Sequence, residues 1–213
     1  PIQRIDPAAA QPAPRATTAR FAHSRAVVIG IDRYQHIRPL STAVSDATRL
    51  AEFLRTHHGY DDVLLLENAT RTALATELGE RLAERVGSGD RLLLYFAGHG
   101  IALDGDEGPE GFLIPADAQE TDRSSFVAMA DLYGWLEALP CRHLLVILDC
   151  CFAGAFTWYG RRSVRPLGAK LFREHYDRFV REPAWQILTS AAHDQEALDV
   201  LGAACQYWTE LLI

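Results

Sequence analysis

The sequence predicts an α/β fold with a mostly parallel central sheet and helices on both of its faces. Short runs rich in β-branched residues and leucine alternate along the chain with segments whose apolar residues recur at helical spacing, which is typical of βαβ units. The runs are almost continuously apolar, as expected for strands covered on both faces. With 213 residues, of which 48% are hydrophobic, the chain is long enough for one domain with one substantial core.

Five apolar runs are predicted as the main strands, and one shorter run as an additional strand. The five lie at residues 26–31, 63–67, 91–97, 143–149 and 185–190, and the shorter run, GFLIP, lies at 111–115. The segment before it, DGDEGPE at 104–110, consists of turn-forming and acidic residues. We therefore expect a mobile loop there.

Three helices are predicted between these strands. Ser41 is a suitable N-cap for the first, whose apolar residues recur at helical spacing until the chain reaches Gly59. Thr70 is the expected N-cap of the second, which continues to Val86. A third helix is expected over about residues 130–138.

Residues 1–23 are predicted to be a flexible leader, because they are rich in Pro, Ala, Gln and Arg and show no apolar period. Residues 24–213 then form the folded domain. No apolar stretch approaches the roughly 20 residues of a bilayer-spanning helix, and the leader lacks the apolar core of a secretory signal. We expect a soluble, cytoplasmic protein without a membrane partner.

The formal net charge of −7 argues against a nucleic-acid partner, since proteins that bind phosphate backbones normally carry an excess of Lys and Arg. A basic partner fits this charge better. The four cysteines are too few and too irregularly spaced for a disulfide framework, so all are expected to be reduced thiols. They are Cys141, Cys150, Cys151 and Cys205.

Two strands are expected to deliver a histidine and a cysteine to the same edge of the sheet. The run at 91–97 is followed by His99, and the run at 143–149 is followed by Cys151. Ligands bind at the carboxyl ends of parallel strands, and neighbouring strands lie about 5 Å apart. If the two strands are neighbours, the imidazole can take the proton of the thiol, which is what a nucleophilic cysteine requires.

Glycines around these two residues support the same prediction. Gly98 and Gly100 flank the histidine and Gly154 follows the cysteine, so a peptide substrate can approach the backbone closely. The backbone N–H groups of Gly100 and Cys151 are therefore candidates for an oxyanion hole.

The segments YFAGHG (95–100) and LDCCFAG (148–154), about fifty residues apart, resemble the caspase and metacaspase superfamily. The second departs from the pentapeptide of animal caspases and is similar to the Asp-x-Cys-x-x-Gly pattern of bacterial metacaspase-like members. This alignment makes Cys151, rather than Cys150, the nucleophile. AVVIGIDRY (26–34) and LTSAAHDQEA (188–197) resemble the family as well. The resemblance implies a caspase-like three-layer sandwich and a cysteine endopeptidase with a Cys/His dyad.

Metacaspase-like members cleave protein substrates after Arg or Lys, and the resemblance implies that Asp46 and Asp149 line the pocket for that residue. Two carboxylates suit this role, since they can bind a guanidinium or an ammonium group. Ala43 and Ala97 stand where many metacaspases have Cys and Ser, which is a departure at the pocket. The resemblance also implies a regulated cell-death or antiviral defence pathway and an activating partner protein.

Two further segments carry hypotheses about regulation. Between Arg161 and Arg181 the chain is rich in Arg and Lys, which indicates a solvated face or, alternatively, a segment that the enzyme itself cuts. The acidic stretch at 104–122 could bind calcium, as in some metacaspases, but it lacks EF-hand spacing and a solvated loop is favoured. No metal or other cofactor is expected. The chain ends at AACQYWTELLI, where similar proteins usually continue into another strand and helix.

Other interpretations remain open at this point. Cys150 is expected to face the core, and His193 competes with His99 as the base. Asp149 could simply end a strand, and Asp46 could be a solvated helix carboxylate. For the whole chain, the alternatives are a catalytically inactive caspase-like interaction module and a flavodoxin-like nucleotide module. The second is disfavoured because neither a P-loop nor a G-x-G-x-x-G motif is present.

Overall fold

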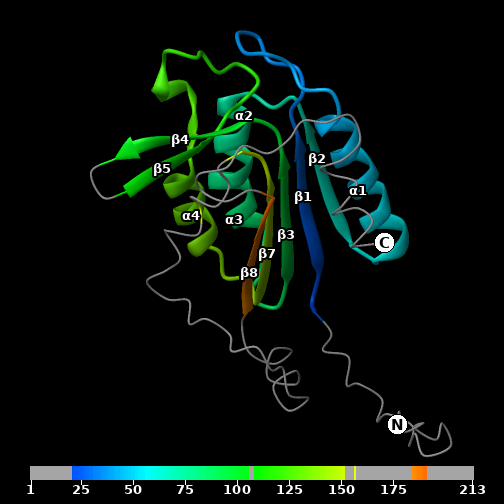
Figure 1. Cartoon of the computed structure of the whole chain (residues 1–213). Coiled ribbons are helices and arrows are strands. Elements are labelled where there is room, and N and C mark those ends of the chain that lie inside the picture. The colour runs from blue at the N-terminus through cyan, green and yellow to red at the C-terminus, as the bar shows by residue number, and fades with distance from the viewer. Residues whose placement is uncertain (1–20, 106–107, 152–155, 157–183, 191–213) are drawn as a thin grey trace, which may run out of the picture.

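The computed structural model describes residues 21–105, 108–151, 156 and 184–190. Five strands form one sheet in the order β2-β1-β3-β7-β8, and every neighbouring pair is parallel (Figure 1). They are β1 (Ser24–Gly30), β2 (Asp62–Glu67), β3 (Arg91–Ala97), β7 (His143–Asp149) and β8 (Ala184–Thr189). The predicted parallel sheet is confirmed, with strand bounds within two residues of those expected.

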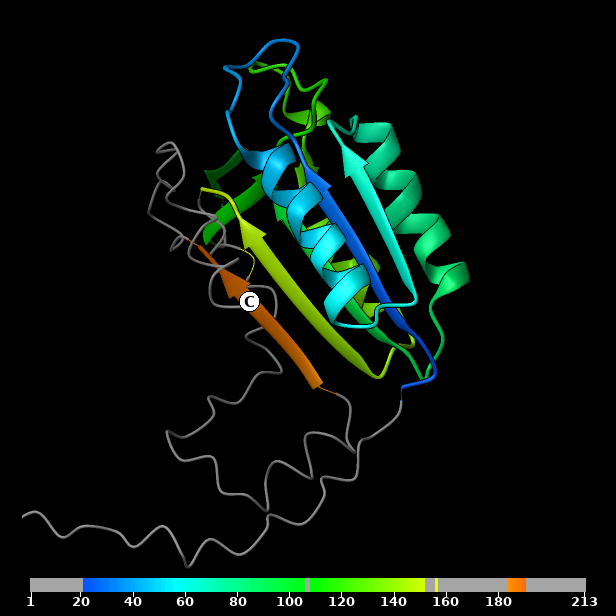
Figure 2. The same cartoon turned by 90° about the vertical axis from the view of Figure 1, so that its right-hand side faces the viewer.

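Helices cover both faces of this sheet, as predicted. One face, called here the α1 face, packs against α1 (Ala43–His57) through residues such as Val28, Leu93 and Tyr95. The opposite face packs against α2 (Arg71–Ala75), α3 (Leu82–Arg85) and α4 (Met129–Glu137). Figure 1 shows these helices on the two sides of the strands, and Figure 2 looks onto the sheet with α1 in front. The result is a three-layer α/β sandwich.

Gly30, the last residue of β1, allows α1 to lie directly on the end of the strand. A Cβ atom at this position would lie 2.6 Å from the carbonyl oxygen of Ala43 and 2.7 Å from the Cβ of Ala47. Real Cβ atoms do not make such contacts, so any side chain here would push the helix away. The first turn of α1, which includes Asp46, is thereby held at the carboxyl edge of the sheet.

Two of the three predicted helices need a correction in detail. The N-cap of α1 is Thr42 rather than Ser41, and its side chain makes no capping hydrogen bond. Thr70 is confirmed as an N-cap, since its Oγ1 accepts a hydrogen bond from the N–H of Ala73 at 3.3 Å. The second helix is interrupted by the π-helical turn η2 (Thr76–Arg81) between α2 and α3. The third predicted helix is α4.

A second, smaller sheet replaces the mobile loop that was expected at 104–110. Its strands β4 (Gly100–Gly105), β5 (Gly108–Leu113) and β6 (Val127–Ala128) are antiparallel, and β6 follows the 3-10 turn η3 (Arg123–Ser125). The loop prediction is wrong for the described residues because β4 and β5 pair along their whole length. Phe112, Ile114 and Phe126 give this unit its own small core.

The described chain begins just before β1. The N–H of Ala22 donates to the carbonyl oxygen of Gly89 at 2.9 Å, and the ring of Phe21 contacts that of His143. The predicted leader therefore falls largely outside the described residues, as do the hypotheses on residues 161–181 and 191–213. Among the helices that the structure describes, none combines the length and apolar character needed to cross a bilayer.

Candidate active site

The strands that carry His99 and the cysteine pair are direct neighbours, as the prediction required. In the parallel pairing of β3 with β7, Ala97 lies opposite Asp149. The N–H of Gly98 continues this pairing beyond the strand ends, since it lies 3.3 Å from the carbonyl oxygen of Asp149. The segments that follow β3 and β7 therefore leave the sheet at the same edge and at the same level.

Gly100 brings the two chain segments into contact. A Cβ atom at residue 100 would lie 2.4 Å from the carbonyl oxygen of Cys151 and 2.9 Å from the Sγ of Cys150. Both distances are shorter than real Cβ contacts, so only glycine is compatible with this packing. The backbone that follows His99 is thus pressed against the backbone of the cysteine pair.

The two vicinal cysteines have different surroundings. Cys150 is only 2% exposed and belongs to the core on the face opposite α1, where burial raises the pKa of its thiol well above the ordinary value. Cys151 is partly exposed. A thiol that is buried and hard to ionise is a poor nucleophile. The expectation that Cys150 faces the core is confirmed, and Cys151 remains the candidate nucleophile.

The imidazole of His99 is held at one of its two nitrogens. Nε2 lies 2.8 Å from the carbonyl oxygen of Arg38, in the loop that follows β1. A carbonyl oxygen only accepts hydrogen bonds, so this contact assigns the hydrogen of the neutral ring to Nε2. Nδ1 then carries the lone pair, which makes it the nitrogen that can accept a proton.

Tyr34 holds the backbone of the same histidine. The N–H of His99 donates to Oη of Tyr34 at 2.8 Å, and that hydroxyl donates to the carbonyl oxygen of Ile31 at 3.1 Å. The two rings are 4.7 Å apart between centroids. Tyr34 and Arg38 were given no role in the sequence analysis. A carbonyl oxygen has no sequence signature, and Tyr34 acts through the main chain.

Both predicted pocket carboxylates lie on the α1 face at the carboxyl edge. Asp46 is 8% exposed in the first turn of α1. Asp149 shares its face with Ala97 and Tyr95, and its Oδ2 lies 3.5 Å from the Oη of Tyr95. Asp46 is therefore not a solvated helix carboxylate.

The amide N–H of Gly100, a predicted oxyanion-hole donor, does not take part in the pairing with β5. The carbonyl oxygen of His99 accepts a hydrogen bond from the N–H of Ile114 at 3.1 Å, so it points toward the chain end of β5. The peptide bond between His99 and Gly100 is trans, as are all the described ones. In a trans peptide the N–H points opposite to the carbonyl. The N–H of Gly100 is therefore directed away from β5.

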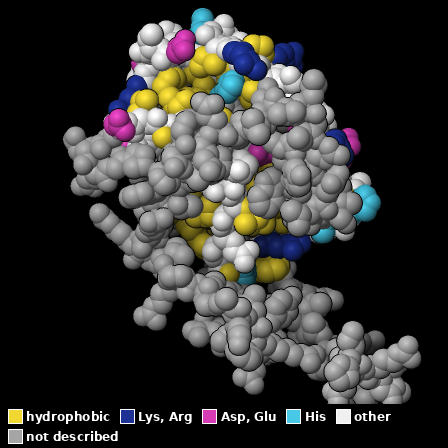
Figure 3. Space-filling view, in the orientation of Figure 1, with side chains coloured by type: hydrophobic (Ala, Val, Ile, Leu, Met, Phe, Trp, Pro, Cys, Tyr) yellow, Lys and Arg dark blue, Asp and Glu magenta, His cyan; other side chains and the backbone are white. Residues whose placement is uncertain are grey.

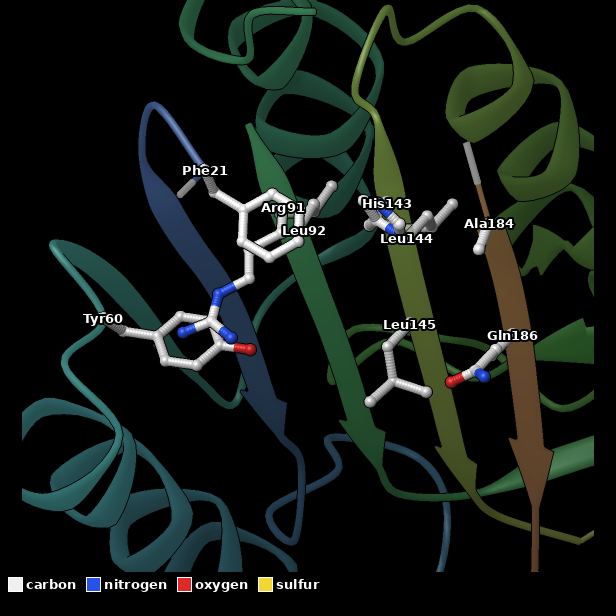
Figure 4. A pocket seen from close by; sticks show the side chains of 9 residues that line it. All are labelled: Phe21, Tyr60, Arg91, Leu92, His143, Leu144, Leu145, Ala184 and Gln186. Carbon is white, nitrogen blue, oxygen red and sulfur yellow. The ribbon is translucent and has the colours of Figure 1, made fainter. Parts of the chain in front are cut away.

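A cavity of about 260 Å³ lies at the opposite edge of the sheet, near the start of β3. Figure 4 shows the guanidinium of Arg91 across the ring of Tyr60, with Leu145 and Gln186 on the strands beyond it. The Cζ of Arg91 is 4.7 Å from the centroid of that ring. This cavity is separate from the candidate site, because His99 follows the other end of the same strand.

The surface beside the candidate site is partly apolar. In the orientation of Figure 1, hydrophobic side chains gather near the loop after β1 and the β4–β5 hairpin, bordered by His and by Lys or Arg (Figure 3). Leu103 of β4 is 36% exposed.

Within the described residues, no group of three or more His, Cys, Asp or Glu side chains is arranged to hold a metal ion. His193, the competing base, lies outside those residues.

Comparison with known proteins supports the fold described above. The model of the Caspase domain family matches residues 23–202. The crystal structure of protein GSU0716 from Geobacter sulfurreducens has a similar fold, with a TM-score of 0.59 and 20% sequence identity over 89% of this chain and 83% of that one. No curated protein matches the sequence. The match to the family model spans most of the chain, and the chain belongs to the caspase domain family.

Proposed function

We propose that the chain is a cysteine endopeptidase that cleaves protein substrates after Arg or Lys, with Cys151 as nucleophile and His99 as general base. The observation that carries this proposal is the packing of Gly100 against the carbonyl oxygen of Cys151. This contact joins the segment that contains the imidazole to the one that contains the partly exposed thiol. The hydrogen bond from Nε2 of His99 to Arg38 adds a reason for the base to be Nδ1.

The reaction follows from these groups. The Sγ–H of Cys151 gives its proton to Nδ1 of His99, and Sγ attacks the carbonyl carbon of the scissile bond. The negative charge moves to the carbonyl oxygen, where the N–H groups of Gly100 and Cys151 stabilise it. The C–N bond then breaks, the leaving amine takes the proton from Nδ1, and a thioester remains. Water deprotonated by His99 hydrolyses the thioester, and the thiol is restored.

The preference for Arg or Lys is supported by Asp46 and Asp149. Asp46 is almost fully buried, and it makes no ion pair with any described residue. A buried carboxylate without a cation is costly, and the guanidinium or ammonium of a substrate would supply one. Asp149 lies on the same face of the sheet. Together the two carboxylates can bind a guanidinium at two points.

The biological setting belongs to the proposal as well, and it rests on the family resemblance. We place the enzyme in a regulated cell-death or defence pathway of the cytoplasm, with an activating partner protein. Self-cleavage between Arg161 and Arg181 is one route of activation, because this segment offers several basic residues. Calcium is a candidate activator only through the acidic residues of 104–122.

A peptide-library cleavage profile at neutral pH, with and without calcium, tests activity and preference together. Replacement of Cys151 by Ala is expected to lower kcat/KM by at least about a thousandfold, because the attacking atom is lost. Cys150→Ala is the matched control, since it removes the adjacent thiol from the core and is expected to leave the kcat/KM of the folded protein within about fivefold. Mass spectrometry of both variants and of the wild type tests whether cuts between Arg161 and Arg181 depend on Cys151.

Three outcomes would each contradict a part of the proposed function. If an activity-based probe labels neither the wild type nor the wild type with candidate activators, the chain is an inactive interaction module. Cleavage that survives His99→Ala would assign the base elsewhere, with His193 the first alternative. A library profile without a preference for Arg or Lys would reject the roles of Asp46 and Asp149, and it would leave the roles of Cys151 and His99 in place.

A further inference from the structure

We propose that Tyr34 is a positioning residue that sets the orientation of the His99 imidazole. The inference rests on the proposed function, because it concerns the base of that reaction. Tyr34 contacts His99 in two ways. Its hydroxyl accepts the backbone N–H at 2.8 Å, and its ring lies 4.7 Å from the imidazole. The structure places its hydroxyl between two main-chain groups, those of His99 and Ile31, so we assign it a positioning role rather than a catalytic one.

The hydroxyl of Tyr34 is fixed on both sides. It donates to the carbonyl oxygen of Ile31, which directly follows β1, and accepts from His99, which follows β3. Burial raises the pKa of Tyr34, so the hydroxyl keeps its proton and continues to donate at neutral pH. The contact is close enough to require glycine at residue 98, where a Cβ atom would lie 2.9 Å from the Oη of Tyr34.

The loop that carries Tyr34 also carries Arg38, whose carbonyl oxygen receives Nε2 of His99 at 2.8 Å. One loop therefore holds the histidine at its main chain and at the far end of its ring. If the hydroxyl contact is lost, the main chain of His99 can shift relative to Arg38, and the hydrogen bond that keeps the hydrogen on Nε2 weakens. Nδ1 would then lose its bias toward the unprotonated form.

The loop is itself anchored by Asn68, which follows β2. Oδ1 of Asn68 accepts from the N–H groups of Asp32 at 3.1 Å and Arg33 at 2.8 Å. Asn68 has a positive φ of 48°, a conformation that glycine adopts without strain. The substitution Asn68→Gly thus removes the anchor while it keeps the backbone, and it offers a second and more distant way to release the loop.

The test compares wild type with Tyr34→Phe, which keeps the ring and removes the hydroxyl. We expect kcat on an Arg peptide to fall about tenfold with KM within about twofold, because a small misplacement of a base costs rate rather than binding. Long-range ¹H–¹⁵N spectra of full-length Cys151→Ala protein are expected to show hydrogen mainly on Nε2 of His99. Adding Tyr34→Phe is expected to give a mixture of tautomers, and Asn68→Gly a smaller shift in the same direction.

Tyr60→Phe is the control, since the hydroxyl of Tyr60 makes no hydrogen bond with the described residues and lies near the opposite edge of the sheet. It should change neither kcat nor the tautomer ratio. An unchanged tautomer ratio in both Tyr34→Phe and Asn68→Gly overturns the inference, whether or not kcat falls. If the wild type cleaves no peptide, the proposed function fails, while the spectra still decide whether Tyr34 orients His99.

Discussion

The carboxylates at the two edges of the central sheet differ in their ion-pair partners. At the amino edge, where the strands begin, Asp62 and Asp90 are both bound by Arg25, at 2.9 and 3.0 Å, and Asp62 also receives Arg85 at 2.6 Å. His23 adds a contact to Asp90 at 3.0 Å. The acids of this cluster have cations beside them, and side-chain pairs join residues that are far apart in the sequence.

At the carboxyl edge, the contacts around the candidate base come from the neutral hydroxyl of Tyr34 and the carbonyl oxygen of Arg38. The nearly buried Asp46 makes no ion pair with a described residue. A carboxylate that is already bound to arginine stabilises the fold, whereas one that still lacks a cation is suited to receive a ligand. This difference supports the proposal that the carboxyl edge receives the basic residue of a substrate.

The largest expected effect comes from breaking the close packing at the carboxyl edge. In Gly100→Ala the new methyl group would collide with the carbonyl oxygen of Cys151, so we expect kcat/KM to fall about a thousandfold. Gly134→Ala in α4 is the matched control, because a Cβ atom there meets nothing within 4 Å. It is expected to stabilise the helix by up to about 1 kcal/mol. Peptide cleavage and urea unfolding measure both variants, and full activity in Gly100→Ala would refute the packing argument.

Exchanging one carboxylate at each edge sharpens the comparison. Asp46→Asn keeps the size of the side chain but removes its charge, and kcat/KM for Arg peptides is expected to fall about a hundredfold. Asp62→Asn at the amino edge is expected to leave kcat/KM unchanged and to cost about 1 kcal/mol of stability. Steady-state kinetics on paired Arg and uncharged peptides provide the measurement. An equal loss on both peptides in Asp46→Asn would mean that Asp46 does not select for charge.

The smallest effect concerns the amino edge alone. Burial by itself would raise the pKa of Asp90, but hydrogen bonds from the N–H of Gly87, Arg25 and His23 outweigh it and hold the pKa below the ordinary value of 3.8. This stabilisation is present above pH 3.8 and is lost as the pH falls through the lower pKa of the folded state. We expect Asp90→Asn to lower the free energy of unfolding by about 2 kcal/mol at pH 7.

The difference between Asp90→Asn and wild type should shrink as the pH falls from 3.8 through the lower pKa of the folded state, because the unfolded wild type then binds a proton that the folded carboxylate does not. Urea unfolding at a series of pH values measures this difference. A constant difference down to pH 2 would show that the effect is not due to the charge of Asp90. Activity per folded molecule should be unchanged at pH 7, since the cluster lies at the edge away from His99.

Several features of the fold could be predicted from local sequence because their causes are local. The continuous apolar runs of β3 and β7 give the strand bounds at 91–97 and 143–149, since burial on both faces leaves no polar position inside them. The hairpin of β4 and β5 could not be predicted in this way. The sequence around its turn is acidic and rich in glycine, as in a loop. The pairing that forms β4 and β5 depends on residues of the two strands that lie opposite each other in space.

The sequence by itself determined that a histidine and a cysteine directly follow the ends of two strands. Each strand and the glycines beside it are consecutive in the sequence, so local patterns are enough to predict them. Only the tertiary structure decided that β3 and β7 are neighbours, that Cys150 is buried in the core, and that Tyr34 and Arg38 hold His99. These facts depend on strand order and on main-chain atoms from distant loops. Every residue has the same main-chain carbonyl, so no side-chain pattern can reveal which one a ring nitrogen will meet.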